Sequence, residues 1–190
     1  MVSQALDLFV TQYIDLMNNN NSDLLVEFDT DWISPCYTQE KVRLDAQPDI
    51  EFVKWNPVLQ QGGNAMQNIG TGLGLNIHDD FSAFFTRYYS LDLPATARRG
   101  ELSLLQVWNQ DDFDRLQKNL IGHVLMKRRL KQPETLFFAL TDEDDFIISL
   151  ENHTGHVVLE QIGKLPCEKL ADNMASFISS LTPLAKNLTL

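Results

Sequence analysis

The sequence has little positive charge, few cysteines and no long apolar run, and each shortage excludes a class of protein. Its 15 Lys and Arg residues face 26 Asp and Glu residues, which gives a formal net charge of -11 and an isoelectric point near 4.6. Such a surface repels nucleic-acid phosphates and anionic lipid headgroups, so we expect no nucleic-acid partner and no direct insertion into lipid. No apolar stretch approaches the roughly 20 residues that a bilayer-spanning helix needs.

Patterns typical of metal sites are also missing. The two cysteines, Cys36 and Cys167, are isolated thiols without metal-ligand spacing, as expected of a protein in a reducing cytoplasm. His153 and His156 are three positions apart, but they straddle an expected turn and lack a second pair of ligands. We therefore expect no metal site.

Nucleotide-binding and catalytic motifs are incomplete where the sequence comes near them. The run Gly70-Thr-Gly-Leu-Gly has Leu75 where a dinucleotide motif needs its next glycine, and no Lys-Ser/Thr pair follows. His78 beside Asp79 imitates a catalytic pair, but adjacent residues of a helix point apart, so a capped, solvent-facing histidine is the simpler interpretation. No serine or cysteine stands in a recognisable nucleophile setting. We expect no catalytic residue, no enzymatic activity and no cofactor.

The strongest pattern in the sequence is a helix between two apolar runs, within residues 102–140. Asn109 can cap this helix by accepting from the N–H three positions on, and Asp111 and Asp112 stand in its first turn, where the helix dipole favours negative charge. Pro133 follows its end. The basic residues of the last turn and beyond are Lys127, Arg128, Arg129 and Lys131. Its expected apolar face consists of Phe113, Leu116, Leu120, Ile121, Val124 and Leu125.

The first third of the chain predicts one helix, a hairpin and a glycine-rich connection. Residues 3–17 place apolar side chains at helical intervals among acidic ones, which indicates an amphipathic helix rather than a secretory signal. Residues 24–37 mix apolar and acidic positions and favour a loop or short irregular elements. Residues 42–44 and 50–55 have the β-branched and aromatic content of two hairpin strands. More than half of the nine glycines lie within residues 62–74, which predicts a flexible or tightly turning connection.

A second helix is expected to begin at Asp79 and Asp80 and to be followed by an irregular segment over residues 91–100. Its aromatic residues recur at helical spacing, as in a helix that fills a core: Phe81, Phe84, Phe85 and Tyr88. His123, in the central helix, is expected to be packed or hydrogen-bonded rather than functional.

The last third of the chain predicts further strands and a closing helix. Residues 146–150 and 157–162 read as strands, which together with a strand from Thr135 make a three-stranded meander. The closing helix, ending near Pro183, would bury Leu170, Met174, Phe177, Ile178 and Leu181. A chain of this length can bury roughly two thirds of its unfolded surface. We expect residues 1–190 to form one α+β domain with a mixed or antiparallel sheet flanked by helices.

Acidic residues are the most informative feature for function, because they occur in clusters. The clusters are Glu27, Asp29 and Asp31; Asp79 and Asp80; Asp111, Asp112 and Asp114; and Asp142, Glu143, Asp144 and Asp145. Helix N-termini alone explain four of these residues, at roughly 0.3–1 kcal/mol for each at an exposed end: Asp79, Asp80, Asp111 and Asp112. Residues 142–145 lack the glycine of a calcium loop and read as a solvated turn. If carboxylates from several segments converge on one concavity, their fields add to a site for a basic partner.

The middle of the chain, from Trp108 to Leu140, resembles the Syd family of the SUKH-like superfamily, bacterial proteins that associate with SecY, the membrane channel of protein secretion. The matching positions are Trp108, Asp111, Asp112, Phe113, Gln117, Asn119, Leu120, Ile121, Gly122, His123, Arg129, Leu130, Lys131, Pro133, Thr135, Leu136 and Phe137. A weaker match is Ser34-Pro-Cys36, whereas residues 62–76 match no pattern of the family.

The resemblance implies a SUKH/Syd-like fold and a loosely attached peripheral protein on the cytoplasmic side of the bacterial inner membrane. It implies an electronegative groove that holds the basic cytoplasmic loops of SecY and monitors or negatively regulates the translocon. Charge agrees with this, because cytoplasmic loops of membrane proteins carry excess Lys and Arg. We expect the acidic residues at element ends on or next to the matched unit to line this groove. They are Asp79, Asp80, Glu101, Asp111 and Asp112.

Two other functions are weighed against this one. An immunity-type protein that neutralises a cationic toxin nuclease would also need an acidic face, and the resemblance to Syd implies a wider superfamily that includes such proteins. A carboxylate-based or magnesium-dependent hydrolase is the weakest alternative, because no set of acidic residues has a recognised spacing with a nucleophile or base.

Overall fold

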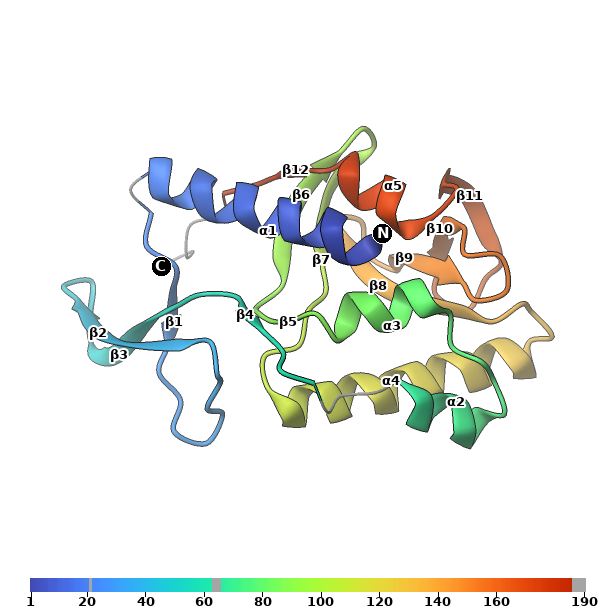
Figure 1. Cartoon of the computed structure of the whole chain (residues 1–190), viewed down its shortest axis with the longest axis horizontal. Coiled ribbons are helices and arrows are strands. Elements are labelled where there is room, and N and C mark those ends of the chain that lie inside the picture. Colours follow the sequence, from blue (N-terminus) through green and yellow to red (C-terminus); the bar gives the residue numbers. More distant parts are fainter. Residues whose placement is uncertain (21, 63–65, 186–190) are drawn as a thin grey trace.

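The computed structural model describes residues 1–20, 22–62 and 66–185 and shows an α+β arrangement (Figure 1). Its helices are α1 (Val2–Asn19), α2 (Gln67–Leu73), α3 (Asp79–Phe85), α4 (Gln110–Arg129) and α5 (Met174–Ser179). Its strands are β1 (Leu25–Glu27), β2 (Tyr37–Leu44), β3 (Gln47–Trp55), β4 (Val58–Leu59), β5 (Tyr88–Tyr89), β6 (Leu93–Ala97), β7 (Gly100–Leu104), β8 (Thr135–Thr141), β9 (Phe146–Glu151), β10 (Val157–Gln161), β11 (Pro166–Ala171) and β12 (Thr182–Pro183).

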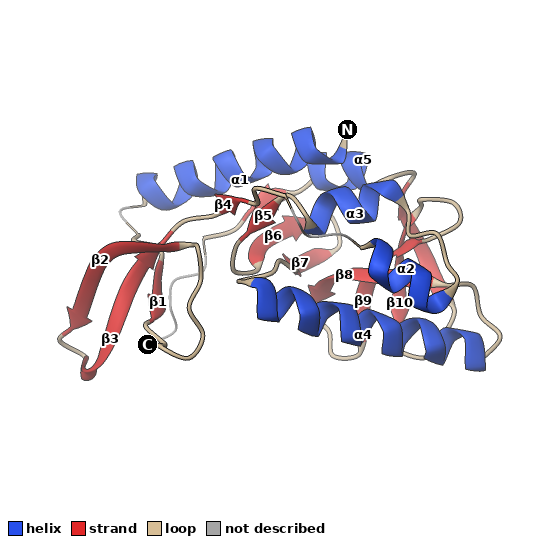
Figure 2. Cartoon of the chain, turned by 60° about the horizontal axis from the view of Figure 1, so that its bottom comes forward, coloured by secondary structure: helices blue, strands red, loops and turns tan. Residues whose placement is uncertain are grey.

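A seven-stranded antiparallel sheet in the order β11-β10-β9-β8-β7-β6-β12 forms the centre of the molecule. Helices α4 and α2 lie on one side of this sheet, and α1, α3 and α5 lie on the other (Figure 2). The predicted helix between two apolar runs is confirmed as α4, and the runs on either side of it form the neighbouring strands β7 and β8. The meander predicted from Thr135 is also confirmed, as β8, β9 and β10.

Helix α4 begins as its sequence predicts and buries a somewhat different face. The Asn109 side chain accepts from the N–H of Asp112 at 2.9 Å, so the predicted cap is confirmed. Four of the six apolar residues assigned to its buried face are buried: Phe113, Leu116, Leu120 and Val124. Leu125, in contrast, is 52% exposed, and His123 and Lys127 take part in the buried face instead. The apolar pattern does not identify His123 and Lys127, because these polar side chains are buried in a hydrogen-bonded network.

That network centres on a fully buried ion pair between α4 and β10. Lys127 Nζ lies 2.5 Å from Glu160 Oε2 and also donates to Gln132 Oε1 and to the Lys164 carbonyl, so all three of its protons are used. The other Glu160 oxygen, Oε1, accepts from the hydroxyls of Thr135 at 2.7 Å and Ser149 at 2.6 Å. The predicted packed histidine is confirmed nearby: His123 is buried, with Nε2 2.9 Å from Thr135 Oγ1.

Burial alone would raise the pKa of Glu160, but its polar neighbours outweigh that effect. Hydrogen bonds from His123, Lys127, Ser149 and Thr135 favour the ionised carboxylate and lower its pKa to about 2. The charge on Glu160 is therefore a fixed part of the structure, and the pair holds the last turn of α4 against the sheet.

A second, three-stranded sheet in the order β1-β3-β2 extends from one end of the molecule (Figures 1 and 2). The predicted hairpin is confirmed, but its strands are longer than expected and the turn between Leu44 and Gln47 is tighter. The segment 24–37 is less irregular than predicted, because its first residues form β1 by pairing with β3. That pairing is made to residues far along the chain and is therefore invisible in the local pattern.

Three other local expectations are corrected. Most of the glycine-rich segment forms α2, where Gly70 is required because a Cβ there would stand 2.5 Å from the Leu75 carbonyl oxygen; residues 63–65 of that segment lie outside the described residues. Residues 91–100, expected to be irregular, supply β6 and the first residue of β7. The closing helix is confirmed only as α5, because Leu170 belongs to β11.

We predict that Lys127→Met destabilises the protein by about 3–5 kcal/mol, because it leaves the Glu160 carboxylate buried without its cation. Lys118→Met, on an exposed position of the same helix, is the matched control and should change stability by no more than about 0.5 kcal/mol. Urea unfolding of the two variants measures the difference. Equal stabilities would show that the buried pair contributes nothing.

Candidate functional site: an acidic groove

A groove with a volume of about 740 Å³ lies between the three-stranded sheet and the body of the molecule; we call it the acidic groove. Its lining consists of Val26, Glu27, Phe28, Asp29, Thr30, Trp32, Tyr37, Ser90, Leu91, Asp92, Gln106, Trp108 and Asp112. Among these described residues four carry carboxylates and none is basic. The charges come from three segments that are far apart in sequence, so folding alone brings them together.

One wall of the acidic groove is formed by β1 and the loop that follows it. Glu27 ends β1 and is exposed, with no hydrogen bond or ion pair among the described residues. Asp29 begins the loop, where its Oδ1 accepts from the N–H of Asp31 at 2.8 Å and its own N–H faces the Tyr37 hydroxyl at 3.4 Å. The alternation of Val26 and Phe28 with Glu27 and Asp29 is that of a strand with one apolar face.

The opposite wall holds its two carboxylates by backbone hydrogen bonds. Asp112 Oδ2 accepts from the N–H of Trp108, and Asp92 Oδ1 accepts from the N–H of Gln106, each at 2.9 Å. The surrounding protein and, to a smaller extent, the Asp112 carboxylate raise the pKa of Asp92 to about 6, against the lowering effect of the Gln106 N–H. Protein atoms surround the Asp92 carboxylate, although the residue remains exposed at the groove surface.

Aromatic rings and a buried serine join the two walls. Trp108 packs edge-on against both Tyr37 and Trp55, with ring centroids 5.4 and 5.6 Å away. The Ser34 hydroxyl donates to the Trp108 carbonyl at 2.5 Å, and the Asn109 amide donates to the Ile33 carbonyl at 2.9 Å. The loop before β2 is thereby fastened to the start of α4, which fixes the width of the acidic groove.

An internal cation already rests on the groove wall. The guanidinium of Arg115, one turn beyond Asp112 on α4, lies 4.5 Å from the centroid of the Trp32 ring. This distance is within the range of a cation–π contact. The acidic groove therefore combines carboxylates with an aromatic surface that accommodates a guanidinium.

The five residues selected from the sequence do not lie together. Asp112 lines the acidic groove, whereas its neighbour Asp111 is exposed on α4 and is not part of the lining. Asp79 and Asp80 begin α3, and Asp79 lines a different hollow beside α2. Glu101 lies on β7, in a hollow that also contains Arg98, Arg99 and Lys169. Only one of the five is thus in the concave acidic surface that the structure forms.

The other three groove carboxylates were accessible to sequence reasoning to different degrees. Glu27 and Asp29 stand out as an acidic cluster, and the strand-like alternation of residues 26–29 is the signal that places them on one edge. Asp92 has no such signal, because it is an isolated acid in a segment that reads as irregular. Its position is set by the hydrogen bond to Gln106, on the far side of the β6–β7 hairpin.

The described part of the chain contains no group of three or more His, Cys, Asp or Glu side chains arranged to hold a metal ion. Burial raises the pKa of the Cys36 thiol to about 11, which removes it as a nucleophile. His78, adjacent to Asp79, accepts from the N–H of Asp80 at 3.2 Å and thereby caps α3; it is half-buried rather than solvent-facing as expected. In residues 1–20, 22–62 and 66–185, none of the helices has both the length and the apolar character to cross a membrane.

Comparison with known sequences assigns the family. A family profile described as Syd protein (SUKH-2) matches residues 3–183. The chain belongs to the Syd family. Protein Syd of Alteromonas mediterranea is 45% identical over 183 residues, which cover 96% of this chain and 97% of that protein. Protein Syd of Pseudoalteromonas atlantica is 41% identical, and that of Aliivibrio fischeri (strain MJ11) is 36% identical, each with 96% of both chains covered.

The Syd match extends well beyond the central unit from which the sequence suggested it. It includes every residue that lines the acidic groove, on both walls. The resemblance to Syd over residues 108–140 and the weaker one at Ser34-Pro-Cys36 meet in the structure, because Ser34 and Trp108 are hydrogen-bonded.

We predict that Asp92 titrates near pH 6 and that Asp112→Asn lowers its pKa, because the variant removes a neighbouring negative charge. NMR titration of the carboxyl carbons measures both values. Since the folded state then binds more protons than the unfolded state between about pH 4 and 6, ionised Asp92 costs stability as pH rises through that window. Asp92→Asn should relieve this cost at about pH 7 and not at about pH 4. An Asp92 pKa near 3.8 would contradict the assignment.

Proposed function

We propose that the acidic groove binds basic cytoplasmic loops of SecY and that this chain is a peripheral protein on the cytoplasmic side of the bacterial inner membrane. The observation that carries the proposal is the convergence of Glu27, Asp29, Asp92 and Asp112 in one hollow without a basic residue in its lining. Membership of the Syd family supports the choice of SecY as partner. The groove holds its partner and carries out no chemical turnover, so binding monitors or negatively regulates the translocon.

Electrostatics supports a cationic protein segment as the occupant. Carboxylates on the walls of a concave, partly apolar site act on a ligand through a lower effective dielectric than bulk water, so their attraction for Lys and Arg is stronger than on a flat surface. The cytoplasmic loops of membrane proteins carry an excess of these two residues. A lipid surface of the same compartment is anionic and is repelled by the net charge of -11.

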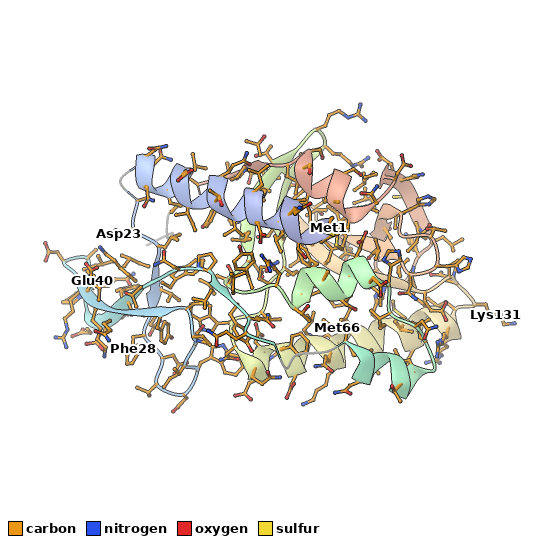
Figure 3. The ribbon with its side chains drawn as sticks, in the orientation of Figure 1. Met1, Asp23, Phe28, Glu40, Met66 and Lys131 are labelled. Atoms are coloured by element: carbon orange, nitrogen blue, oxygen red, sulfur yellow. The ribbon has the colours of Figure 1, made fainter. Side chains whose placement is uncertain are left out.

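The distribution of charge along the molecule supports attachment of the partner through the acidic groove rather than through the opposite end. The basic end of α4 lies far from the acidic groove: Figure 3 shows Phe28 at the end that carries the small sheet and Lys131 at the opposite end. Arg128 in this last turn is paired with Glu134 at 3.0 Å. Among the described residues, cation–π contacts to rings that line the groove come from Arg115 on Trp32 and from Lys41 on Phe28, and Lys41 is also paired with Glu51 at 2.6 Å.

We predict that Glu27→Lys weakens binding to SecY-containing membranes about tenfold, which corresponds to roughly 1.4 kcal/mol, because it reverses a charge on the groove wall. Asp144→Lys in the β8–β9 turn and Asp79→Lys at α3 change the net charge equally and lie outside the groove. Both should bind nearly as well as the unchanged protein. Co-sedimentation with membrane vesicles measures all three affinities.

Equal losses in the three variants would indicate attraction by net charge alone and would remove the acidic groove from the proposal. A loss in Asp79→Lys alone would transfer the site to the hollow beside α2. Capture of a cationic nuclease by the unchanged protein, abolished by Glu27→Lys, would favour an immunity-type function of the same groove.

We also predict that added salt weakens the association. Exposed charges of opposite sign are screened over roughly 8 Å at physiological ionic strength and over about 3 Å at 1 M. Affinity for SecY-containing vesicles should fall progressively between about 0.05 and 0.5 M salt, and mainly through a slower association rate. The salt dependence should be shallower for Glu27→Lys, which has one attraction fewer. Binding that is insensitive to salt would contradict an electrostatic groove.

A further inference from the structure

In the part of the chain that the structure describes, strand β1 has a partner strand on one edge and none on the other. That partner is β3, in the sheet order β1-β3-β2. Trp55 N–H donates to the Leu24 carbonyl at 2.9 Å, and Phe28 N–H donates to the Glu51 carbonyl at 2.8 Å. Because the backbone groups of a strand alternate in direction, the N–H and C=O groups of Leu25 and Glu27 point away from β3. No hydrogen bond to these outward groups is present among the described residues.

This free edge coincides with the wall of the acidic groove. Five consecutive residues, 26–30, line the groove, so the polypeptide backbone itself forms part of its surface. Figure 2 shows β1 on the side of the small sheet that faces the body of the molecule. A chain segment lying in the groove therefore meets unpaired backbone donors and acceptors as well as carboxylates.

A buried polar atom on the opposite wall also lacks a partner. Gln106 is 7% exposed and lines the acidic groove, yet its side-chain Oε1 accepts no hydrogen bond among the described residues. An acceptor left unpaired in a buried setting is unfavourable. Its Nε2 donates to the Leu105 carbonyl at 2.7 Å. Because the terminal torsion of a glutamine side chain is soft, a rotation of the Gln106 amide is the change by which Oε1 would accept from an occupant of the groove.

The charges beside β1 decide which segments can use its edge. Exposed edges invite pairing with other chains, and proteins commonly protect them with short strands and charged residues. Here the strand has three residues, and Glu27 and Asp29 stand at its end. These carboxylates repel other copies of a chain whose net charge is -11, and they attract a cationic segment. The edge is protected against self-association and remains open to a basic partner.

We propose that the acidic groove takes its partner as an extended basic segment that pairs with the free edge of β1 as an added strand. The inference rests on the proposed function and specifies how the partner is recognised. Backbone hydrogen bonds along β1 supply affinity that is independent of sequence, and the carboxylates select Lys and Arg at alternate positions of the segment. A volume of about 740 Å³ is within the range of roughly 300–1,000 Å³ that is typical of ligand-binding clefts.

The test uses a capped synthetic peptide of alternating arginine and valine and two N-methylated forms of it. One form carries the methyl groups on the arginine amides and the other on the valine amides, so all three have the same charge. In an added strand the N–H groups of alternate residues face β1 and the others face away. One methylated form should therefore lose affinity about tenfold or more relative to the other.

Amide hydrogen exchange of the protein gives the second measurement, and it requires no variant. Binding of the unmethylated peptide should slow exchange at Leu25 and Glu27 by about tenfold or more. Arg43 is the matched control, because its register opposite Glu51 points its N–H outward from β2, the other edge of the small sheet. Its exchange should not change.

The outcomes separate this inference from the proposed function. Unequal affinities of the methylated peptides with protection at Leu25 and Glu27 support strand addition. Equal affinities and unchanged exchange at those amides, with the peptide still bound in a salt-dependent manner, overturn strand addition and leave a groove that recognises side chains only. Failure of all three peptides to bind at low salt overturns both proposals.

Discussion

The hydrogen bond from Ser34 to the Trp108 carbonyl is the contact on which the functional architecture depends. It links the loop before β2 to the residue that precedes the cap of α4, across 74 positions of sequence. The Asn109 amide reinforces it by donating to the Ile33 carbonyl, and Trp108 packs on Tyr37 and Trp55 at the same junction. Both walls of the acidic groove take their relative position from this junction, so its width is a consequence of buried hydrogen bonds rather than of the acidic residues themselves.

The sequence predicts the elements that are stabilised locally. Helix α4 is recognisable from its cap, its acidic first turn and its basic last turn, because each of these interactions lies within a few residues of the chain. Strands β1 and β6 are not recognisable in this way. They are short, and their hydrogen bonds go to partners on other segments, so a local pattern contains little of the information that forms them.

The same distinction explains the candidate site. Asp111 and Asp112 are adjacent in sequence and equivalent in composition, yet only Asp112 faces the groove, where it also accepts from the Trp108 N–H. Asp92 is held at the groove because its carboxylate accepts a hydrogen bond from the N–H of Gln106. Acidity of a segment can be read from sequence, whereas convergence of carboxylates requires the tertiary contacts that orient them. For that reason the family resemblance predicts that an acidic surface exists more reliably than it predicts which residues form that surface.

Glu160 and Asp92 differ in how completely their surroundings compensate the charge of the carboxylate. Glu160 receives two hydroxyls and an ammonium group, so its negative charge is neutralised within the core and is unavailable to any partner. Asp92 receives a single backbone N–H and stands near another carboxylate, which raises its pKa toward neutrality. An incoming cation favours the ionised form of such a carboxylate, because its attraction offsets the cost of desolvation and the repulsion from the neighbouring carboxylate. Among the described residues, the acidic groove thus has carboxylates without a cation in its lining, an unpaired Gln106 Oε1 and outward backbone groups on β1, and the proposed basic, extended segment would supply a partner for each of the three.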